Sequence, residues 1–120
     1  MQWPILPNFL NKELYVYFST PVKPREEVAK MLSEHLEYQV TLEQKGIMFG
    51  AGPMFEKGAD IPRRGMIIVR AKSFEEAEEI AAADPMHTSG MREYTLERWH
   101  MNEGGVTLRV TFSNQAANII

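Results

Sequence analysis

Two titratable residues occupy positions where apolar side chains are expected. His35 lies in the middle of the apolar face of a predicted helix, seven residues from both Val28 and Leu42. Asp84 continues the inner face of a second predicted helix at its last turn, although a helix C-terminus favours cations over anions. If a histidine and a carboxylate face the same core, they can share or transfer a proton. This is the arrangement that general acid–base catalysis uses.

Each of the two residues also has a purely structural explanation. A histidine on an apolar face is commonly a core residue whose hydrogen bonds are satisfied locally. The dipeptide Asp84-Pro85 is typical of an N-cap followed by a first helical position, so Asp84 could simply begin a short turn. From the residues alone, the catalytic and the structural explanations both stay open.

His87 follows three positions after Asp84 and is the third candidate. At the mouth of the same cavity it could contact a substrate, although polar loop residues are commonly only solvated. With His35 and Asp84 it has the composition of a two-histidine, one-carboxylate metal site. The spacing of the three residues matches no metal-binding motif, so we predict a site without metal.

Two arginines and a tryptophan complete the candidate substrate contacts. Arg63 and Arg64 follow Pro62 in a long predicted loop, where adjacent guanidinium groups could clamp an anionic substrate or simply increase solubility. Trp99 is expected to pack in the core or at a subunit interface, and we include it among the candidate substrate contacts.

The composition excludes several classes of function. The chain has 120 residues and a formal net charge of −3, which argues against nucleic acid as a partner because phosphate binding needs a basic face. It has no cysteine, so disulfides, thiolate metal sites and cysteine nucleophiles are excluded. Nucleotide-binding glycine loops, nucleophile elbows and HExxH are absent, and we predict no cofactor. No signal peptide and no run of roughly 18 apolar residues is present, so we expect a cytoplasmic protein without a membrane partner.

The elements that must position these residues alternate in the order βαββαβ, with one strand added. This order predicts an α+β, ferredoxin-like fold in which both helices cover one face of an antiparallel sheet. The turn NEGG should join the last two strands as a hairpin. The predicted domain covers 13–112, between an N-terminal extension, 1–12, and a tail, 113–120, that is expected to fray. The strands are predicted at 13–20, 47–54, 66–72, 92–101 and 106–112, and the helices at 24–45 and 73–84.

The strand ELYVYFST is apolar on both of its faces. A strand of this kind needs cover on both sides, and the two helices can supply it on one side only. A second subunit is the natural cover for the other side, so we expect a homodimer or a higher oligomer.

Three segments resemble the YciI-related (YCII) family of the dimeric α/β-barrel superfamily, which also contains muconolactone isomerase. The segments are SEHLEYQVTLEQKGIMFGAGPM, FEEAEEIAAADPMHTSGMREYTLERW and NEGGVTLRV. The shared pattern is H-x2-Y-x3-L-E-x2-G, then glycine-proline, then D-P-x-H, and the resemblance covers about residues 13–112.

The resemblance implies a homodimer whose two sheets pack face to face, with one cleft in each subunit. The suspected catalytic histidine and aspartate of that family map onto His35 and Asp84, and His87 corresponds to a second histidine of a longer variant. The family implies lyase, isomerase or dehalogenation chemistry on ring-derived acids, often without a cofactor.

The leading hypothesis is therefore a cofactor-independent acid–base enzyme acting on a small organic acid or a ring-derived enol or lactone. His35 would move the proton, and Asp84 would orient His35 or serve as the acid. The first alternative is a non-catalytic dimer that binds or senses a small ligand. A second is an oxygen-using or haem-binding relative, because the superfamily contains such barrels.

Overall fold

A computed structural model describes residues 4–120, which fall into two compact units. The larger unit is Glu13–His100, and the smaller combines the N-terminal segment up to Lys12 with Met101–Ile120. The first three residues of the predicted extension lie outside the described residues. We describe each unit by itself. No helix among residues 4–120 has the length and apolarity that crossing a membrane requires.

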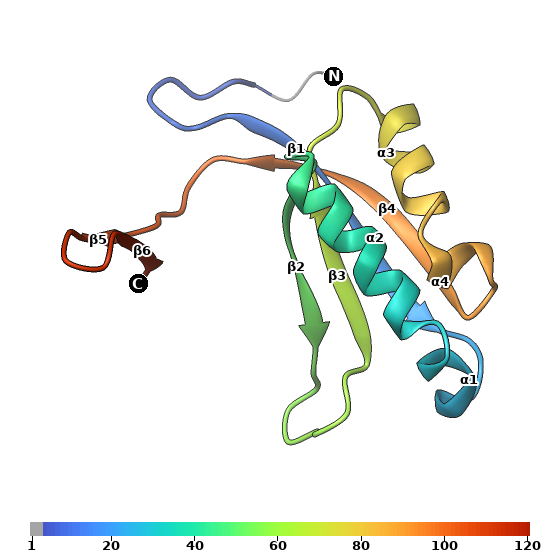
Figure 1. Ribbon diagram of the computed structural model, residues 1–120. Coiled ribbons are helices and arrows are strands. Elements are labelled where there is room, and N and C mark those ends of the chain that lie inside the picture. Colours follow the sequence, from blue (N-terminus) through green and yellow to red (C-terminus); the bar gives the residue numbers. More distant parts are fainter. Residues whose placement is uncertain (1–3) are drawn as a thin grey trace. The chain divides into compact units, whose positions relative to one another are not determined.

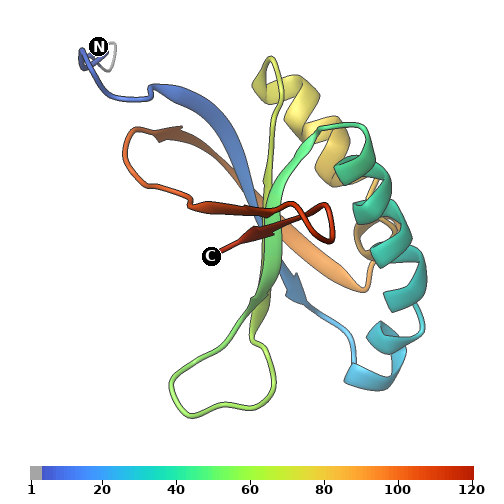
Figure 2. The same cartoon turned by 60° about the vertical axis from the view of Figure 1, so that its left-hand side comes forward.

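The larger unit has the predicted α+β, ferredoxin-like plan. Its four strands form one sheet in the order β2-β3-β1-β4, and β3 is antiparallel to both β1 and β2. The helices α2 and α3 cover the same face of this sheet (Figures 1 and 2). The elements are β1 (Lys12–Pro21), α1 (Arg25–Ala29), α2 (Leu32–Gln44), β2 (Met48–Met54), β3 (Arg64–Val69), α3 (Phe74–Ala82), α4 (Pro85–Thr88) and β4 (Arg92–Met101).

The register between β1 and β3 decides which side chains meet the helices. Tyr17 lies opposite Ile67 and Ser19 lies opposite Gly65. Because successive side chains alternate between the two faces of a strand, Phe18 points to the face away from the helices. We call the covered side the helix face. The core on this face contains Tyr15, Tyr17, Ile67, Val69, Ala77 and Ala81.

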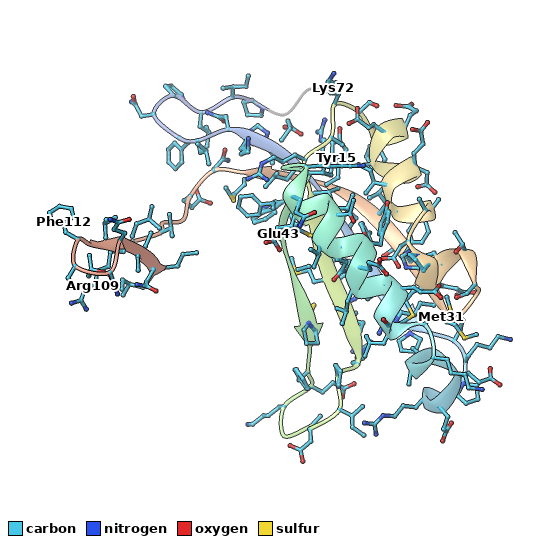
Figure 3. All side chains as sticks on the ribbon, viewed as in Figure 1. Tyr15, Met31, Glu43, Lys72, Arg109 and Phe112 are labelled. Carbon is cyan, nitrogen blue, oxygen red and sulfur yellow. The ribbon has the colours of Figure 1, made fainter. Side chains whose placement is uncertain are left out.

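The predicted helix 24–45 is in fact two helices. Between α1 and α2 the amide of Lys30 bonds to the carbonyl of Glu27 at 3.0 Å, and the amide of Met31 bonds to Val28 at 3.0 Å. These i to i−3 bonds make a tighter turn than an α-helix, which reorients α2 at Met31 (Figure 3). Within α2, His35 and Leu42 are buried.

The second predicted helix begins as expected and ends slightly earlier. Ser73 is the N-cap of α3, and its side-chain oxygen accepts a hydrogen bond from the amide of Glu76 at 3.1 Å. The helix ends at Ala82, and Ala83 is its C-cap. Asp84 therefore lies just beyond α3, where it can begin a new turn.

The smaller unit contains a hairpin of β5 (Leu108–Thr111) and β6 (Ala116–Ile119). The predicted pairing across NEGG is wrong, because β5 pairs with β6 instead of β4, and the tail forms β6 where we expected fraying. The turn explains the difference: Asn114 Oδ1 accepts from the amide of Ala116 at 3.2 Å, and Gln115 adopts a φ of 53°. Figure 3 labels Arg109 and Phe112 on this hairpin.

Candidate functional site

His35 and Asp84 form a buried pair that joins α2 to the start of α4. Nδ1 of His35 lies 2.8 Å from Oδ1 and 3.0 Å from Oδ2 of Asp84. His35 is 5% exposed and Asp84 is 0% exposed, so water screens this interaction little. Because an ionised carboxylate only accepts hydrogen bonds, the proton between them is on Nδ1 of His35. The side chains of His35 in α2 and of Asp84 at the start of α4 therefore meet, as the sequence pattern suggested.

Asp84 is also the N-cap of α4, so both explanations of this residue hold together. Its backbone is extended, with a φ of −60° and a ψ of 128°, and Pro85 occupies the first helical position. Oδ1 accepts a hydrogen bond from the amide of Met86 at 2.9 Å. The anion therefore begins one helical turn instead of ending another, which removes the apparent conflict with the helix dipole.

His35 also lines a cavity. Because Nδ1 is committed to Asp84, Nε2 is unprotonated in the neutral imidazole and has no partner among residues 4–120. The cavity has a volume of about 340 Å³ and lies among α2, β2, β3 and the start of β4. Its walls are largely apolar, and its polar side chains besides His35 are Gln39, Arg64 and Arg92. A free basic nitrogen at the edge of an apolar cavity is suited to accept a proton from a small ligand.

His87 lies behind the pair and does not line this cavity. Its Nδ1–H donates to the carbonyl of Ala81 at 2.6 Å, and its Nε2 accepts from the hydroxyl of Ser19 at 2.7 Å. Burial lowers the pKa of His87 from its ordinary value of 6.5, while the bond to Ala81 and the charge of Asp84 act in the opposite direction. A neutral His87 matches these two hydrogen bonds, because it has one donor nitrogen and one acceptor nitrogen.

The remaining predicted contacts are dispersed. Arg63 is exposed and lies 3.8 Å from the carboxylate of Glu56. Arg64 belongs to the cavity wall, but its guanidinium carbon is 4.2 Å from the ring centre of Phe18. Trp99 does not line the cavity and has its ring centre 6.4 Å from that of Phe49. Of the predicted site residues, the cavity wall includes His35 and Arg64, and Asp84 holds His35.

Three residues near this site were not among the candidates. Ser19 holds His87, and alternation along β1 could have placed it on the same face as Tyr17. The hydroxyl of Tyr17 is buried and has no hydrogen-bond partner among the described residues. Its pKa is raised by burial first and by the negative charge of Asp84 second. Arg92 lines the cavity, and no local motif marks it.

The three residues considered for a metal site are arranged differently. Both ring nitrogens of His87 are engaged by Ser19 and Ala81, and Nδ1 of His35 is engaged by Asp84. Within residues 4–120, no group of three or more histidine, aspartate or glutamate side chains is placed to hold a metal ion.

Comparisons with known proteins agree with this fold. The uncharacterized protein YjpA of Bacillus subtilis (strain 168) is 26% identical over 90 residues, which is 75% of this chain and the whole of that protein. Among solved structures, 5-chloro-2-hydroxyhydroquinone dehydrochlorinase (TftG) of Burkholderia phenoliruptrix AC1100, in complex with 2,5-dihydroxybenzoquinone, matches with a TM-score of 0.60. That match has 20% sequence identity and covers 72% of this chain and 92% of TftG, so it shows a shared fold.

The family comparison extends over most of the chain. The sequence model of the YCII-related domain matches residues 7–100, a range that includes His35, Asp84 and every residue of the cavity wall. This chain belongs to the YCII-related family.

Proposed function

We propose that this protein is a cofactor-independent acid–base enzyme that acts on a small organic acid or a ring-derived enol or lactone. The observation that carries the proposal is the buried hydrogen bond between Asp84 and His35, a histidine that lines an apolar cavity. The reaction class is that of a lyase, an isomerase or a dehalogenase.

His35 is the proton-transfer residue in this proposal. Nε2 takes a proton from a carbon or a hydroxyl group of the ligand, and the electron pair left behind moves into the ring. The negative charge of Asp84 stabilises the imidazolium that forms and keeps Nδ1 protonated throughout. The electron pair then expels a leaving group in an elimination, or the proton returns to another atom in an isomerisation.

The structural neighbour supports the choice of reaction class. TftG is a dehydrochlorinase whose structure contains 2,5-dihydroxybenzoquinone. A loss of hydrogen chloride requires removal of a proton and departure of chloride, which one positioned base can assist. We therefore propose hydroxylated rings, chlorinated or not, as the first substrates to assay.

A ligand-binding protein without catalytic activity is the alternative. His35 is 5% exposed, so a ligand has little access to Nε2 unless it fills the cavity completely. A cavity that only retains a ligand needs no such access. Under this alternative, the pair of His35 and Asp84 would support the cavity wall and would transfer no proton.

We also propose that the protein is a homodimer, as its sequence predicts, and that it acts in the cytoplasm. In the smaller unit, an isolated two-stranded hairpin is at best marginally stable in water. Its apolar side chains are exposed, which favours burial of this surface in an assembly. These side chains are Leu108, Val110, Phe112 and Ile119.

Turnover of hydroxyquinols, chlorohydroquinones and small lactones should be assayed with the wild type and with His35→Asn. A positioned general base contributes roughly 10²- to 10⁴-fold to the rate, so His35→Asn should lose about that factor. His100→Asn is the matched control, because His100 contacts Glu13 and does not line the cavity. If His35→Asn converts an identified substrate as fast as the wild type, the proposed function is wrong. If a ligand stabilises the wild type and is recovered unchanged, the binding alternative is correct.

A further inference from the structure

Arg92 is a cation at the cavity wall that the proposed chemistry does not yet use. It is the first residue of β4 and lies on the helix face, where Nη1 is 3.8 Å from the position that a Cβ on Gly65 would occupy. Gly65 is opposite Ser19 in the β1–β3 register, and both Gly65 and Arg92 line the cavity together with His35. The guanidinium is thus held over the sheet at the same cavity that His35 lines.

The guanidinium of Arg92 is half-buried, and one of its donors has no acceptor within the described part of the chain. Its Nε–H is buried and has no hydrogen-bond partner among residues 4–120, and no carboxylate in that range forms an ion pair with it. An unpaired buried donor costs free energy, and it costs more when the group is charged. Such a group is expected where an acceptor arrives from outside the chain.

The neighbouring arginines differ from Arg92 in this respect. Arg63 is paired with Glu56, and the guanidinium of Arg64 stacks on Phe18. Phe18 points away from the helix face, so Arg64 directs its charge away from His35. Burial lowers the pKa of Arg92 and the charge of Asp84 raises it, but an arginine stays protonated at neutral pH. Arg92 is therefore the cation that can serve a ligand in this cavity.

We propose that Arg92 binds the anionic end of the ligand, a pair of adjacent oxygens on a small planar ring, through the terminal nitrogens of its guanidinium. The oxygen pair is either a carboxylate or a neighbouring carbonyl and enolate, and both present the two acceptors that a guanidinium edge recognises. The apolar walls formed by Pro53, Leu36 and Ile67 contact the ring itself. The position of the reacting atom in this inference rests on the proposed function. The binding of the anion to Arg92 does not.

This assignment also explains how an anion can enter near Asp84. A negative ligand beside a buried carboxylate would be repelled in a medium that screens charge poorly. Arg92 compensates the ligand charge, while the Asp84 charge is directed to His35 by two short contacts. The charged and titratable side chains that line the cavity are Arg92, His35 and Arg64, whose guanidinium stacks on Phe18, and Asp84 and His87 are the further groups that interact with them.

The test compares anionic and neutral probes by calorimetric titration. Benzoate represents the carboxylate, 2-hydroxybenzoquinone represents the carbonyl–enolate pair, and benzamide is the neutral isostere of benzoate. The variants are Arg92→Gln and Arg92→Lys. Arg98→Gln is the matched control, because Arg98 lies on the same strand and pairs with Glu13 at 3.4 Å at an exposed position.

In Arg92→Gln, the affinity for at least one anionic probe should fall about 10- to 100-fold, while the affinity for benzamide is unchanged. Arg92→Lys should recover little of the loss, because an ammonium group cannot make the paired contact. The probe that responds identifies the kind of oxygen pair. Arg98→Gln should bind every probe as the wild type does.

Unchanged binding of both anions to Arg92→Gln would overturn the proposal, and so would a wild type that binds neither anion at millimolar concentration. If Arg92→Gln does not fold, the same criteria apply to Arg92→Lys. His35→Asn separates this inference from the proposed function. That variant should keep the anion affinity and lose turnover. A wild type that binds an anion but converts no substrate would leave the Arg92 site intact and reject the proposed enzyme.

Discussion

Replacing Asp84 by asparagine separates the two interactions of this carboxylate. Asparagine is a good N-cap, so Oδ1 can still accept from the amide of Met86 and retain the cap, which contributes about 1 kcal/mol. The other side-chain atom changes from an acceptor to an NH2 donor and meets the Nδ1–H of His35. Oδ1 still lies 2.8 Å from Nδ1, but the NH2 group beside it disfavours a proton on Nδ1, so the tautomer shifts toward Nε2–H, in which Nδ1 accepts from the amide.

The expected cost in the free energy of unfolding follows from these bonds. A charge-assisted hydrogen bond contributes about 1.5–3 kcal/mol and a neutral one about 0.5–1.5, so Asp84→Asn should lose about 1–2 kcal/mol. For a unit of this size, that loss lowers the melting temperature by roughly 5–15 °C. Asp84→Ala also removes the cap and leaves His35 without an acceptor, and it should lose about 3–5 kcal/mol.

Urea unfolding followed by circular dichroism measures the loss of unfolding free energy in both variants. The rate of turnover of a substrate found for the wild type reports which ring nitrogen of His35 carries the proton. A protonated Nε2 cannot act as a base, so Asp84→Asn should lose far more activity than stability. The corresponding substitution in a serine protease triad lowers kcat about 10⁴-fold. An Asp84→Asn variant that matched the wild type in stability and in turnover would show that the carboxylate does not set the proton on His35. Equal stability of the asparagine and alanine variants would refute the capping argument.

Three further outcomes are expected. Tyr38→Phe should destabilise the protein by about 1 kcal/mol, because the hydroxyl of Tyr38 donates to the carbonyl of Ile80 at 2.6 Å. Tyr17→Phe should leave the unfolding free energy unchanged or raise it, because the Tyr17 hydroxyl has no partner among the described residues, and urea unfolding compares the two variants. Neutral His87 should stabilise the fold fully above pH 6.5, its ordinary pKa, and this contribution should be lost as the pH falls through the lowered native pKa; His87→Asn should flatten the dependence of unfolding free energy on pH below 6.5. Light scattering at micromolar concentration should give the mass of a dimer or a higher oligomer, and a monomeric mass would refute the assembly proposal.

Local patterns in the sequence were sufficient for the strands of the larger unit and for the central pair, although the predicted helix 24–45 is divided at Lys30–Met31. Helical periodicity placed His35 among buried side chains, and the Asp-Pro dipeptide gave Asp84 its capping geometry. The β-branched and aromatic run identified the strand β1, in which residues 14–17 are buried. These inferences succeeded because each depends on residues within one or two turns of one another.

The sequence failed where the answer depends on long-range register. Arg63 and Arg64 are adjacent, but a shift of one residue along a strand reverses the face that a side chain reaches. Arg92 meets Gly65 only because β4 and β3 both flank β1 in the sheet, which no local pattern reveals. The pairing of β5 with β6 was missed for a related reason, because Asn114 and Gln115 supply a turn that competes with NEGG.

The position of His87 supports a role in holding Asp84 in place. The segment from Ala81 to His87 closes on itself, because Nδ1 of His87 bonds to the carbonyl of Ala81 and the amide of His87 bonds to the carbonyl of Asp84 at 2.8 Å. Ser19 ties this closed segment to the central strand of the sheet. The carboxylate that orients His35 is thus fixed by backbone bonds on both sides and by β1 beneath it. Because Asp84 is held in this way, His35 needs little reorganisation when it accepts a proton, which is the condition that favours catalysis over simple binding.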